Sequence, residues 1–298
     1  MPTPSLFPGL FSVSVLQLLA GSGLLAMMAA RAGAVEVHSV EMVTALATAA
    51  KHIVAQNGFG DRVSIHRIMS TQLDPADVGG LFDVLVCEIV DDQLLGEGVL
   101  TTIADARRRL LTPDAAVIPC GAAIYALPIE MRIGERAGFA LDELNTFATD
   151  MSLAPRAHAG CKLQRFPAED YKVLAKPIKL FDFDFARTPI EQLAKGRTNS
   201  SLFIEVERSG LLTAFLIYFD LRCDTAAGNR FSNGPATRQL VAWDQSMRCL
   251  PLEVRLTAGQ RVPLTAEHDF EAVRVGVPQL HPSMFMDTIG HREILNQR

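Results

Sequence analysis

The sequence predicts a two-part fold, in which a mostly parallel α/β sheet is followed by an all-β part. Patterns typical of strands and helices alternate up to about residue 121, which favours a parallel sheet covered on both faces. From residue 122 onward, strand patterns separated by Pro, Gly and Asn dominate instead. A chain of 298 residues, 49% of them hydrophobic, is long enough to bury two cores.

The first part, residues 1–121, contains four apolar strand patterns and three helical ones. Gly21-Ser22-Gly23 predicts a tight turn after the first strand, and Asn57-Gly58 predicts the end of the second helix. The expected strands are 13–19, 34–41, 61–68 and 81–88, and the expected helices are 24–33, 42–58 and 98–111.

The second part, residues 122–298, is predicted to be a barrel or a sandwich. Helical periodicity is weak there except at 141–151, and residues 139–166 carry few strand signals, which predicts an arm or a long loop. The expected strands are 122–133, 178–185, 201–209, 211–223 and 252–256.

Composition limits the classes of partner and of metal site. A net charge of −5 argues against a surface that binds polyanions, so nucleic acid is not an expected partner, whereas basic partners are weakly favoured. The cysteines form no Cys-x-x-Cys pair and their number is odd, which predicts reduced thiols in a cytoplasmic or nuclear protein and no zinc site: Cys87, Cys120, Cys161, Cys223 and Cys249.

The N-terminal segment admits two interpretations. Residues 1–30 carry no charged side chain, and 9–30 is about long enough to span a bilayer, which would make it a membrane anchor or an export signal. No Lys or Arg precedes this stretch, however, and a Gly-Ser-Gly turn lies at its centre. A strand, a turn and a buried helix explain these residues better, so no membrane partner is expected.

Small and acidic residues lie where the predicted parallel strands end. Gly21 and Gly23 follow the first strand, and Glu41 closes the second. Ligands of parallel sheets bind beyond these strand ends, where small residues admit a ligand and a carboxylate accepts ribose hydroxyls. Because no phosphate-binding lysine and no full G-x-G-x-x-G is present, we expect a nucleoside-like ligand without phosphates.

A second pair of acids follows the fourth strand, in "CEIVDDQLLGEGVL". Glu88 ends the strand, and Glu97 lies nine residues later between two glycines. Carboxylates are costly to desolvate unless a cation or donors satisfy them, so they are either solvated loop acids or a pair that awaits a cation. We expect Asp91 and Asp92 to be solvated loop acids, and the basic run 107–109 to be a solvated helix end.

The order "GSGLLAMMAARAGAVEVHSVE", "FDVLVCEIVDDQLLGEGVL" and then a β part resembles the protein arginine N-methyltransferases from about Val15 onward. The spacing of the two glutamates and "MSTQL" are most similar to the branch that contains the monomethylating type III enzymes. "LFDFDF" and "LIYFDL" resemble strands of the family's β-barrel, and "SNGPATRQLVAWDQ" resembles the loop that normally reads Thr-His-Trp.

The resemblance implies a Rossmann-like S-adenosylmethionine-dependent methyltransferase domain at 1–121 and a β-barrel-like substrate domain at 122–298. It implies that Gly21, Gly23 and Glu41 bind S-adenosylmethionine, and that Ser70 lies near its adenine. It also implies that the arm at about 139–166 docks on a second copy, which would make a homodimer.

The resemblance further implies that Glu88 and Glu97 hold the guanidinium of an arginine in a protein or peptide, and that Trp243 closes this pocket. A carboxylate is the best bidentate partner of a guanidinium. The cation that the two glutamates await would then be the substrate arginine, and the reaction would be methyl transfer to a guanidinium nitrogen.

The chain departs from the family pattern in three regions: the opening glycine motif, the position before the tryptophan, and the N-terminus. Gln17 stands where the family has an acid, Leu19 replaces the first glycine, and Ala242 replaces the histidine before the tryptophan. Only residues 1–12 stand where the family has helices. These departures keep open an alternative, a catalytically inactive homologue that serves as a binding or dimerisation module. A fragment, a misplaced gene start or a decayed homologue would each give this pattern.

Overall fold

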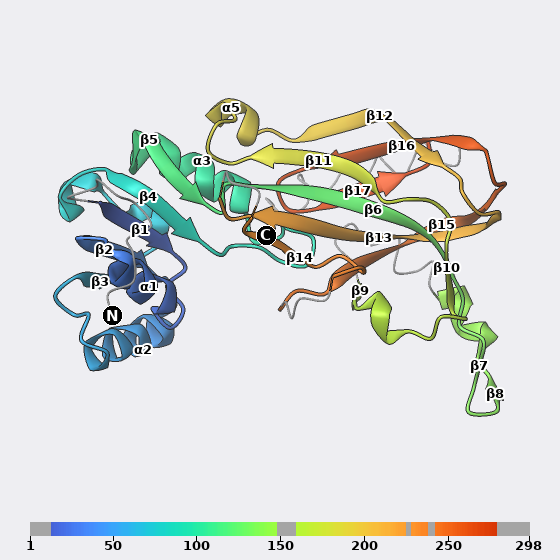
Figure 1. Cartoon of the computed structure of the whole chain (residues 1–298), viewed down its shortest axis with the longest axis horizontal. Coiled ribbons are helices and arrows are strands. Elements are labelled where there is room, and N and C mark those ends of the chain that lie inside the picture. The colour runs from blue at the N-terminus through green and yellow to red at the C-terminus, as the bar shows by residue number, and fades with distance from the viewer. Residues whose placement is uncertain (1–12, 148–158, 225–227, 238–241, 279–298) are drawn as a thin grey trace, which may run out of the picture.

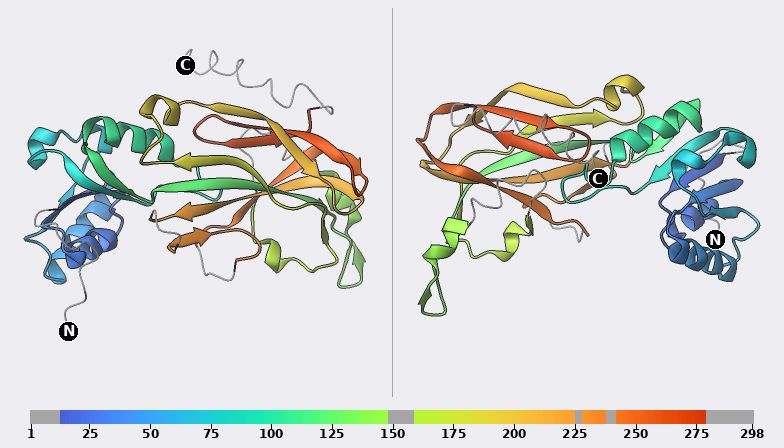
Figure 2. Two further views of the ribbon diagram at one scale, coloured as in Figure 1. Left: turned by 45° about the horizontal axis from the view of Figure 1, so that its top comes forward. Right: turned by 180° about the vertical axis from the view of Figure 1, so that it is seen from behind.

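The computed structural model describes residues 13–147, 159–224, 228–237 and 242–278. The chain forms two parts that lie end to end along its long axis (Figure 1). Two further views show the same arrangement, with the parallel sheet in one part and long antiparallel strands in the other (Figure 2). The change of architecture falls between a strand that ends at Ile118 and one that begins at Gly121. The assignment of cofactor binding to residues 1–121 and of substrate binding to residues 122–298 stays a prediction.

The first part is a five-stranded parallel sheet in the order β3-β2-β1-β4-β5. Alternation along β1 sends Val15 to the face covered by α1 and α2, and Leu16 to the face covered by α3. The strands are β1 (Ser14–Leu18), β2 (Glu36–Val40), β3 (Val63–His66), β4 (Phe82–Cys87) and β5 (Leu111–Ile118), and the helices are α1 (Leu24–Ala32), α2 (Thr44–Gln56) and α3 (Val99–Arg109).

The apolar N-terminal pattern folds as a strand, a turn and a helix. β1 is the central strand, paired in parallel with β2 on one side and with β4 on the other. Among the described residues, no helix is both long and apolar enough to cross a membrane. The part of the 9–30 pattern that precedes residue 13 lies outside the described residues.

The strand β5 was not predicted, because residues 98–111 were expected to be helical to their end. α3 instead ends at Arg109, and β5 begins at Leu111. Pro113 and Asp114 hide this strand from pattern analysis, since both residues are uncommon in strands. β5 is an edge strand of the sheet, and an edge position tolerates proline.

The second part is barrel-like, but two separate antiparallel sheets form it rather than one closed barrel. Both sheets contribute to one apolar core, in which Phe215 of β13 and Leu264 of β16 are fully buried. The larger sheet contains β6 (Gly121–Met131), β9 (Ala159–Cys161), β10 (Tyr171–Val173), β11 (Ile178–Asp184), β13 (Gly210–Arg222), β14 (Arg230–Ser232) and β15 (Gln245–Leu256), and the smaller contains β12 (Arg197–Glu205), β16 (Arg261–His268) and β17 (Val273–Gly276). Five of these strands were not predicted: β9, β10, β14, β16 and β17.

The segment expected to be an arm, 139–166, is only partly outside the larger sheet. A short hairpin of β7 (Glu135–Arg136) and β8 (Phe139–Ala140) precedes a 3-10 helix η3 (Asp142–Phe147). β9 then pairs with β15, so the end of the expected arm belongs to the sheet. Residues 148–158, and with them the end of the predicted helix 141–151, lie outside the described residues.

The basic end of α3 joins the two parts of the chain, contrary to the expectation of a solvated helix end. Arg107 Nη1 donates to the carbonyl oxygens of Phe185 and Thr188, at 3.1 and 2.6 Å. These residues lie between β11 and the short helix α5 (Ile190–Leu193). Hydrogen bonds from a charged donor are stronger than neutral ones, so α3 has a defined position against the β part.

The turn between β1 and α1 has a left-handed backbone at three positions. Gly21 and Gly23 have φ of 50° and 78°, and Leu19 has φ of 59°. The left-handed region costs a residue with a Cβ roughly 1–2 kcal/mol. The Leu19 side chain is 47% exposed, so its burial offsets little of this cost.

We expect Leu19→Gly to unfold with a free energy about 1 kcal/mol higher than Leu19→Ala, because only glycine relieves the left-handed strain. Alanine is the matched control, since it shortens the side chain but keeps the Cβ. Urea denaturation of the two variants measures the difference. Equal stabilities would show that the backbone at residue 19 is not strained.

Candidate active site

Glu41 lies just beyond β2 and holds the turn that follows β1. Its Oε2 accepts a hydrogen bond from Gly21 N at 3.1 Å, and its Oε1 accepts one from Val43 N at 2.9 Å. The side chain is buried, and these two donors offset the free energy that its desolvation costs. Each carboxylate oxygen has a second lone pair, so Glu41 retains capacity to accept hydroxyl donors from a ligand.

Glycine is required at the two positions of the turn for different structural reasons. Within the part of the chain that the structure describes, a Cβ at Gly21 would meet no atom within 4 Å other than those of its chain neighbours, so the space beside this residue is open there. A Cβ at Gly23 would lie 3.0 Å from Val54 Cγ2, so glycine lets α1 pack closely against α2. Gly21 therefore offers an open backbone to a ligand, whereas Gly23 sets the position of α1.

Gln17 stabilises the same turn from the opposite side. Its Nε2 donates to the carbonyl oxygen of Leu19 at 2.9 Å, and its Oε1 accepts from the hydroxyl of Ser39 at 2.6 Å. The side chain is almost fully buried. The neutral amide at this position is thus engaged in holding the backbone of residue 19.

Ser70 begins a 3-10 helix, η1 (Ser70–Gln72), in the segment that follows β3. Arg109 of α3 fixes this segment, because its Nη1 donates to the Leu73 carbonyl at 2.9 Å and its Nη2 to the Ser70 carbonyl at 3.2 Å. Arg109 also binds Asp105 of the same helix. Ser70 therefore lies beyond the end of β3, as Glu41 lies beyond the end of β2.

Glu88 and Glu97 interact across the loop between β4 and α3. Partial desolvation raises the pKa of Glu88, and the indole N–H of Trp243 offsets part of this rise. Partial desolvation also raises the pKa of Glu97, and the negative charges of Glu88 and Asp91 raise it further. The two glutamates are thus close enough to repel each other, while both still reach solvent.

Asp91 gives this loop its shape and is not a solvated acid, contrary to expectation. Its Oδ1 accepts from Gln93 N at 3.1 Å and from Gly96 N at 3.0 Å. A Cβ at Gly96 would clash with the same carboxylate, so only glycine fits there. Leu94 is fully buried with φ of 79°, an unusual conformation for a leucine.

The β part contacts this loop through Trp243 and Asp244. The indole Nε1 of Trp243 donates to the Val90 carbonyl at 2.9 Å, and its ring packs edge-on against Phe219, with centroids 5.4 Å apart. Asp244 N donates to Asp92 Oδ1 at 2.8 Å. Asp92 is therefore also a structural residue rather than a solvated one, and the structure brings Trp243 to the loop that carries the two glutamates.

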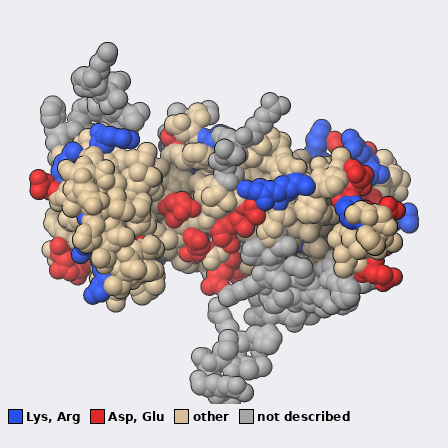
Figure 3. Space-filling model, turned by 90° about the horizontal axis from the view of Figure 1, so that it is seen from below, with Lys and Arg blue, Asp and Glu red and all other residues tan. Residues whose placement is uncertain are grey.

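The loop between β4 and α3 is rich in acidic residues, with Glu88, Asp91, Asp92 and Glu97 within ten positions of one another. Acidic side chains gather near the middle of one face, between the two parts of the chain (Figure 3). Two neighbouring carboxylates with raised pKa can bind a cation that offers several N–H donors, because the cation offsets both their repulsion and their lost hydration. Within the described residues, no group of three or more His, Cys, Asp or Glu side chains is arranged to hold a metal ion.

Comparison of the sequence with known proteins finds close relatives, although no family model matches it. The chain is 32% identical over 272 residues to an arginine N(omega)-methyltransferase of Streptomyces achromogenes subsp. streptozoticus, covering 89% of this chain and 71% of that enzyme. It is 28% identical over 303 residues to protein arginine N-methyltransferase 7 of Drosophila grimshawi, covering 91% of this chain but 42% of that protein.

Solved structures share the fold. The crystal structure of PRMT6 superposes with a TM-score of 0.68 at 17% identity, covering 92% of this chain and 93% of that one. The Trypanosoma brucei PRMT1 enzyme-prozyme complex with AdoHcy superposes with a TM-score of 0.67 at 22% identity, covering 86% and 78%. The identity to the Streptomyces enzyme over most of both sequences shows that this chain belongs to the arginine N-methyltransferase family.

Proposed function

We propose that this chain transfers a methyl group from S-adenosylmethionine to a guanidinium nitrogen of an arginine in a protein or peptide. One observation carries the proposal: Glu88 and Glu97 are close enough to couple electrostatically, and Trp243 of the β part lies beside them. A guanidinium is cationic at every working pH and presents N–H donors in a plane, which suits two carboxylates. Membership in the family supports the same reaction.

The two glutamates bind and orient the substrate in this proposal. Paired with both carboxylates, the guanidinium has its charge localised and one nitrogen turned toward the cofactor side of the pocket. Partial desolvation raises the pKa of both carboxylates, and a cation that enters between them offsets this effect. S-adenosylmethionine, when bound, supplies a sulfonium methyl group as the electrophile.

The residues at the strand ends fit a nucleoside-like cofactor. Gly21 leaves open space beside its backbone, and Glu41 has lone pairs left for ribose hydroxyls. The segment that begins at Ser70 lies beyond the neighbouring strand, where the adenine is expected. The alternative of a catalytically inactive binding module is not favoured, because the retained glutamate pair suits catalysis and the relatives reported above are named as methyltransferases.

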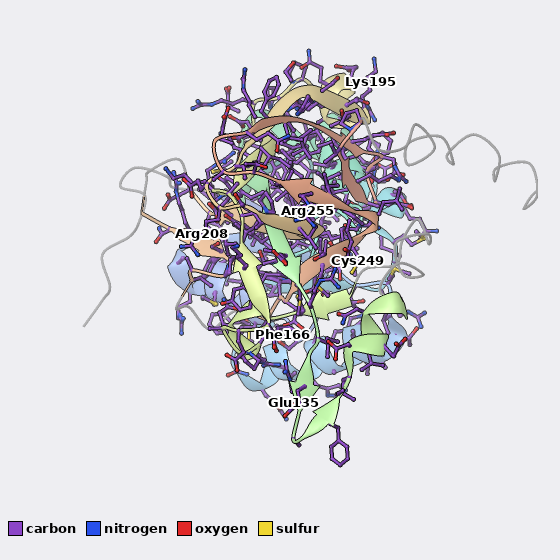
Figure 4. All side chains as sticks on the ribbon, turned by 90° about the vertical axis from the view of Figure 1, so that its right-hand side faces the viewer. Glu135, Phe166, Lys195, Arg208, Cys249 and Arg255 are labelled. Atoms are coloured by element: carbon purple, nitrogen blue, oxygen red, sulfur yellow. The ribbon has the colours of Figure 1, made fainter. Side chains whose placement is uncertain are left out.

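We further propose that two copies associate through the β7–β8 hairpin. The hairpin that begins at Glu135 projects from the body of the molecule (Figure 4), and Phe139 at its turn is 70% exposed. On the other part of the chain, apolar side chains of α1 and of the start of α2 are also exposed: Leu24, Met28, Met42, Val43 and Leu46. A large exposed apolar patch commonly marks an interface, so the hairpin of one copy would dock on these helices of the other. A cytoplasmic or nuclear location stays a prediction.

We expect Glu88→Gln to abolish methyl transfer to an arginine peptide while the affinity for S-adenosylmethionine changes less than about twofold, because only the substrate side loses a charge. Glu41→Ala should instead weaken cofactor binding about tenfold or more, since it removes an acceptor and the support of Gly21. Calorimetry and a methylation assay measure both. Glu36→Ala, at the opposite end of β2, is the control, and equal cofactor losses in all three variants would refute these roles.

As the pH falls, we expect binding of the arginine substrate to be lost at a pH higher than the pKa of an ordinary glutamate. The pKa of both Glu88 and Glu97 is raised, and only the ionised pair attracts a guanidinium, so binding is complete above these pKa values and is lost as pH falls through them. In Glu88→Gln, the pKa of Glu97 should move down, because one repelling charge is gone. Carboxyl NMR titration checks this, and an unchanged Glu97 titration would mean that the two groups are not neighbours.

Phe139→Asp should shift the chain from dimer toward monomer, with an association constant lower by about tenfold or more, because a charge cannot be buried in an apolar interface without a partner. Phe231→Asp is the matched control, since Phe231 of β14 is also exposed but lies outside the hairpin. Sedimentation analysis of both variants decides. A Phe139→Asp protein that associates like the unmodified chain would contradict the hairpin interface.

A further inference from the structure

One buried side chain, Asn233, connects the two loops that form the proposed arginine pocket. Its Nδ2 donates to the carbonyl oxygen of Asp92, at 3.3 Å, in the loop that carries Glu88 and Glu97. The same nitrogen donates to the carbonyl oxygen of Asp244, at 2.6 Å, beside Trp243. A primary amide has two donor hydrogens, so both of them are used to join these loops.

The remaining polar groups of Asn233 fix it to the β part. Its Oδ1 accepts from Phe219 N at 2.7 Å, and its own N donates to the Phe219 carbonyl at 3.3 Å. Its carbonyl oxygen accepts from the side chain of Gln245. Only 1% of Asn233 is exposed, so a group left without its partner here would cost free energy. The side chain is thus held by β13 and presents its amide nitrogen to the two loops.

The conformation of the loop that carries the two glutamates depends on hydrogen bonds to residues outside it. Residues 88–98 form neither a helix nor a strand, so no ladder of hydrogen bonds fixes them. Within the loop, Asp91 accepts from Gln93 and Gly96. Across to the β part, the loop is bound by Trp243 at Val90, and by Asn233 and Asp244 at Asp92. Asn233 thus bonds to both loops and to a strand of the larger sheet.

We propose that Asn233 is a positioning residue for arginine recognition, which sets the separation between the glutamate pair and Trp243. The inference rests on the proposed function, because it assigns a role in holding the guanidinium. Two carboxylates and an indole suit a flat guanidinium only at a fixed spacing, and a misplacement of about 1 Å can cost about 100-fold in rate. Asn233 touches neither cofactor nor substrate in this role, and it acts through the loops alone.

The variant Asn233→Asp separates positioning from ordinary support of the sheet. It keeps an oxygen that can accept from Phe219 N but loses both donors to the loops. Asn199→Asp is the matched control, because Asn199 of β12 also donates to a backbone carbonyl, that of Leu180, and accepts from a backbone N–H, that of Ser201. If Asn233→Asp does not fold, Asn233→Ser replaces it as the test variant, because serine adds no charge.

Trp243 is the only tryptophan, so its fluorescence reports on the pocket without any need for catalysis. In Asn233→Asp we expect emission shifted to longer wavelength, kcat/KM for an arginine peptide lower by about 10- to 100-fold, and calorimetric affinity for S-adenosylmethionine within about twofold of the unmodified chain. Asn199→Asp should change none of these.

Two results would overturn the positioning role. One is an Asn233→Asp protein whose emission and kcat/KM match the unmodified chain. The other is an equal loss in Asn199→Asp, which would indicate general damage to the β part. If the unmodified chain methylates no arginine peptide, the proposed function fails, and the emission of Trp243 in the two variants still decides whether Asn233 holds the loops together.

Discussion

The repulsion between Glu88 and Glu97 is the constraint on which the site depends. Partial desolvation raises the pKa of both carboxylates, and the charges of Glu88 and Asp91 raise that of Glu97 further, so the pair keeps its spacing only while the loop holds its shape. Asp91 and Gly96 close the loop from inside, and Trp243 ties it from outside. A cation bound between the two carboxylates would offset this repulsion, which suits the proposed guanidinium substrate.

Neither part of the chain supplies all the residues of the proposed arginine pocket. The parallel sheet supplies Glu88, because β4 ends there, whereas the antiparallel part supplies Trp243. The hydrogen bonds from Arg107 hold the two parts together near α3, the helix that begins directly after the glutamate loop. The same helix fixes the segment at Ser70 through Arg109. One helix thus connects the proposed cofactor side, the glutamate loop and the β part.

Local sequence patterns predicted the strands and the residues at their ends, because these features depend on the local spacing of apolar residues. Alternating apolar residues located β1 to β4, and the positions of Glu41 and Glu88 followed from where those strands end. Pro113 hid β5, since an edge strand tolerates a residue that pattern analysis reads as a breaker. The tie from Asn233 to Asp92 joins residues 141 positions apart, and "SNGP" reads only as a turn. Contacts of this kind depend on how the two parts pack against each other, and a local sequence pattern carries no information about that packing.

The departures at Gln17 and Leu19 change the charge of the turn after β1 more than its shape. Gln17 donates to the carbonyl of Leu19 while Glu41 accepts from Gly21, so the turn is held from both sides. Leu19 keeps the left-handed backbone, at a cost in strain that glycine would not have. In the proposed cofactor site, a neutral amide in place of a carboxylate would remove one negative charge near a ligand that carries a sulfonium and an ammonium group. The turn keeps its backbone shape, so in this proposal the lost charge would lower the affinity for the cofactor rather than change its orientation.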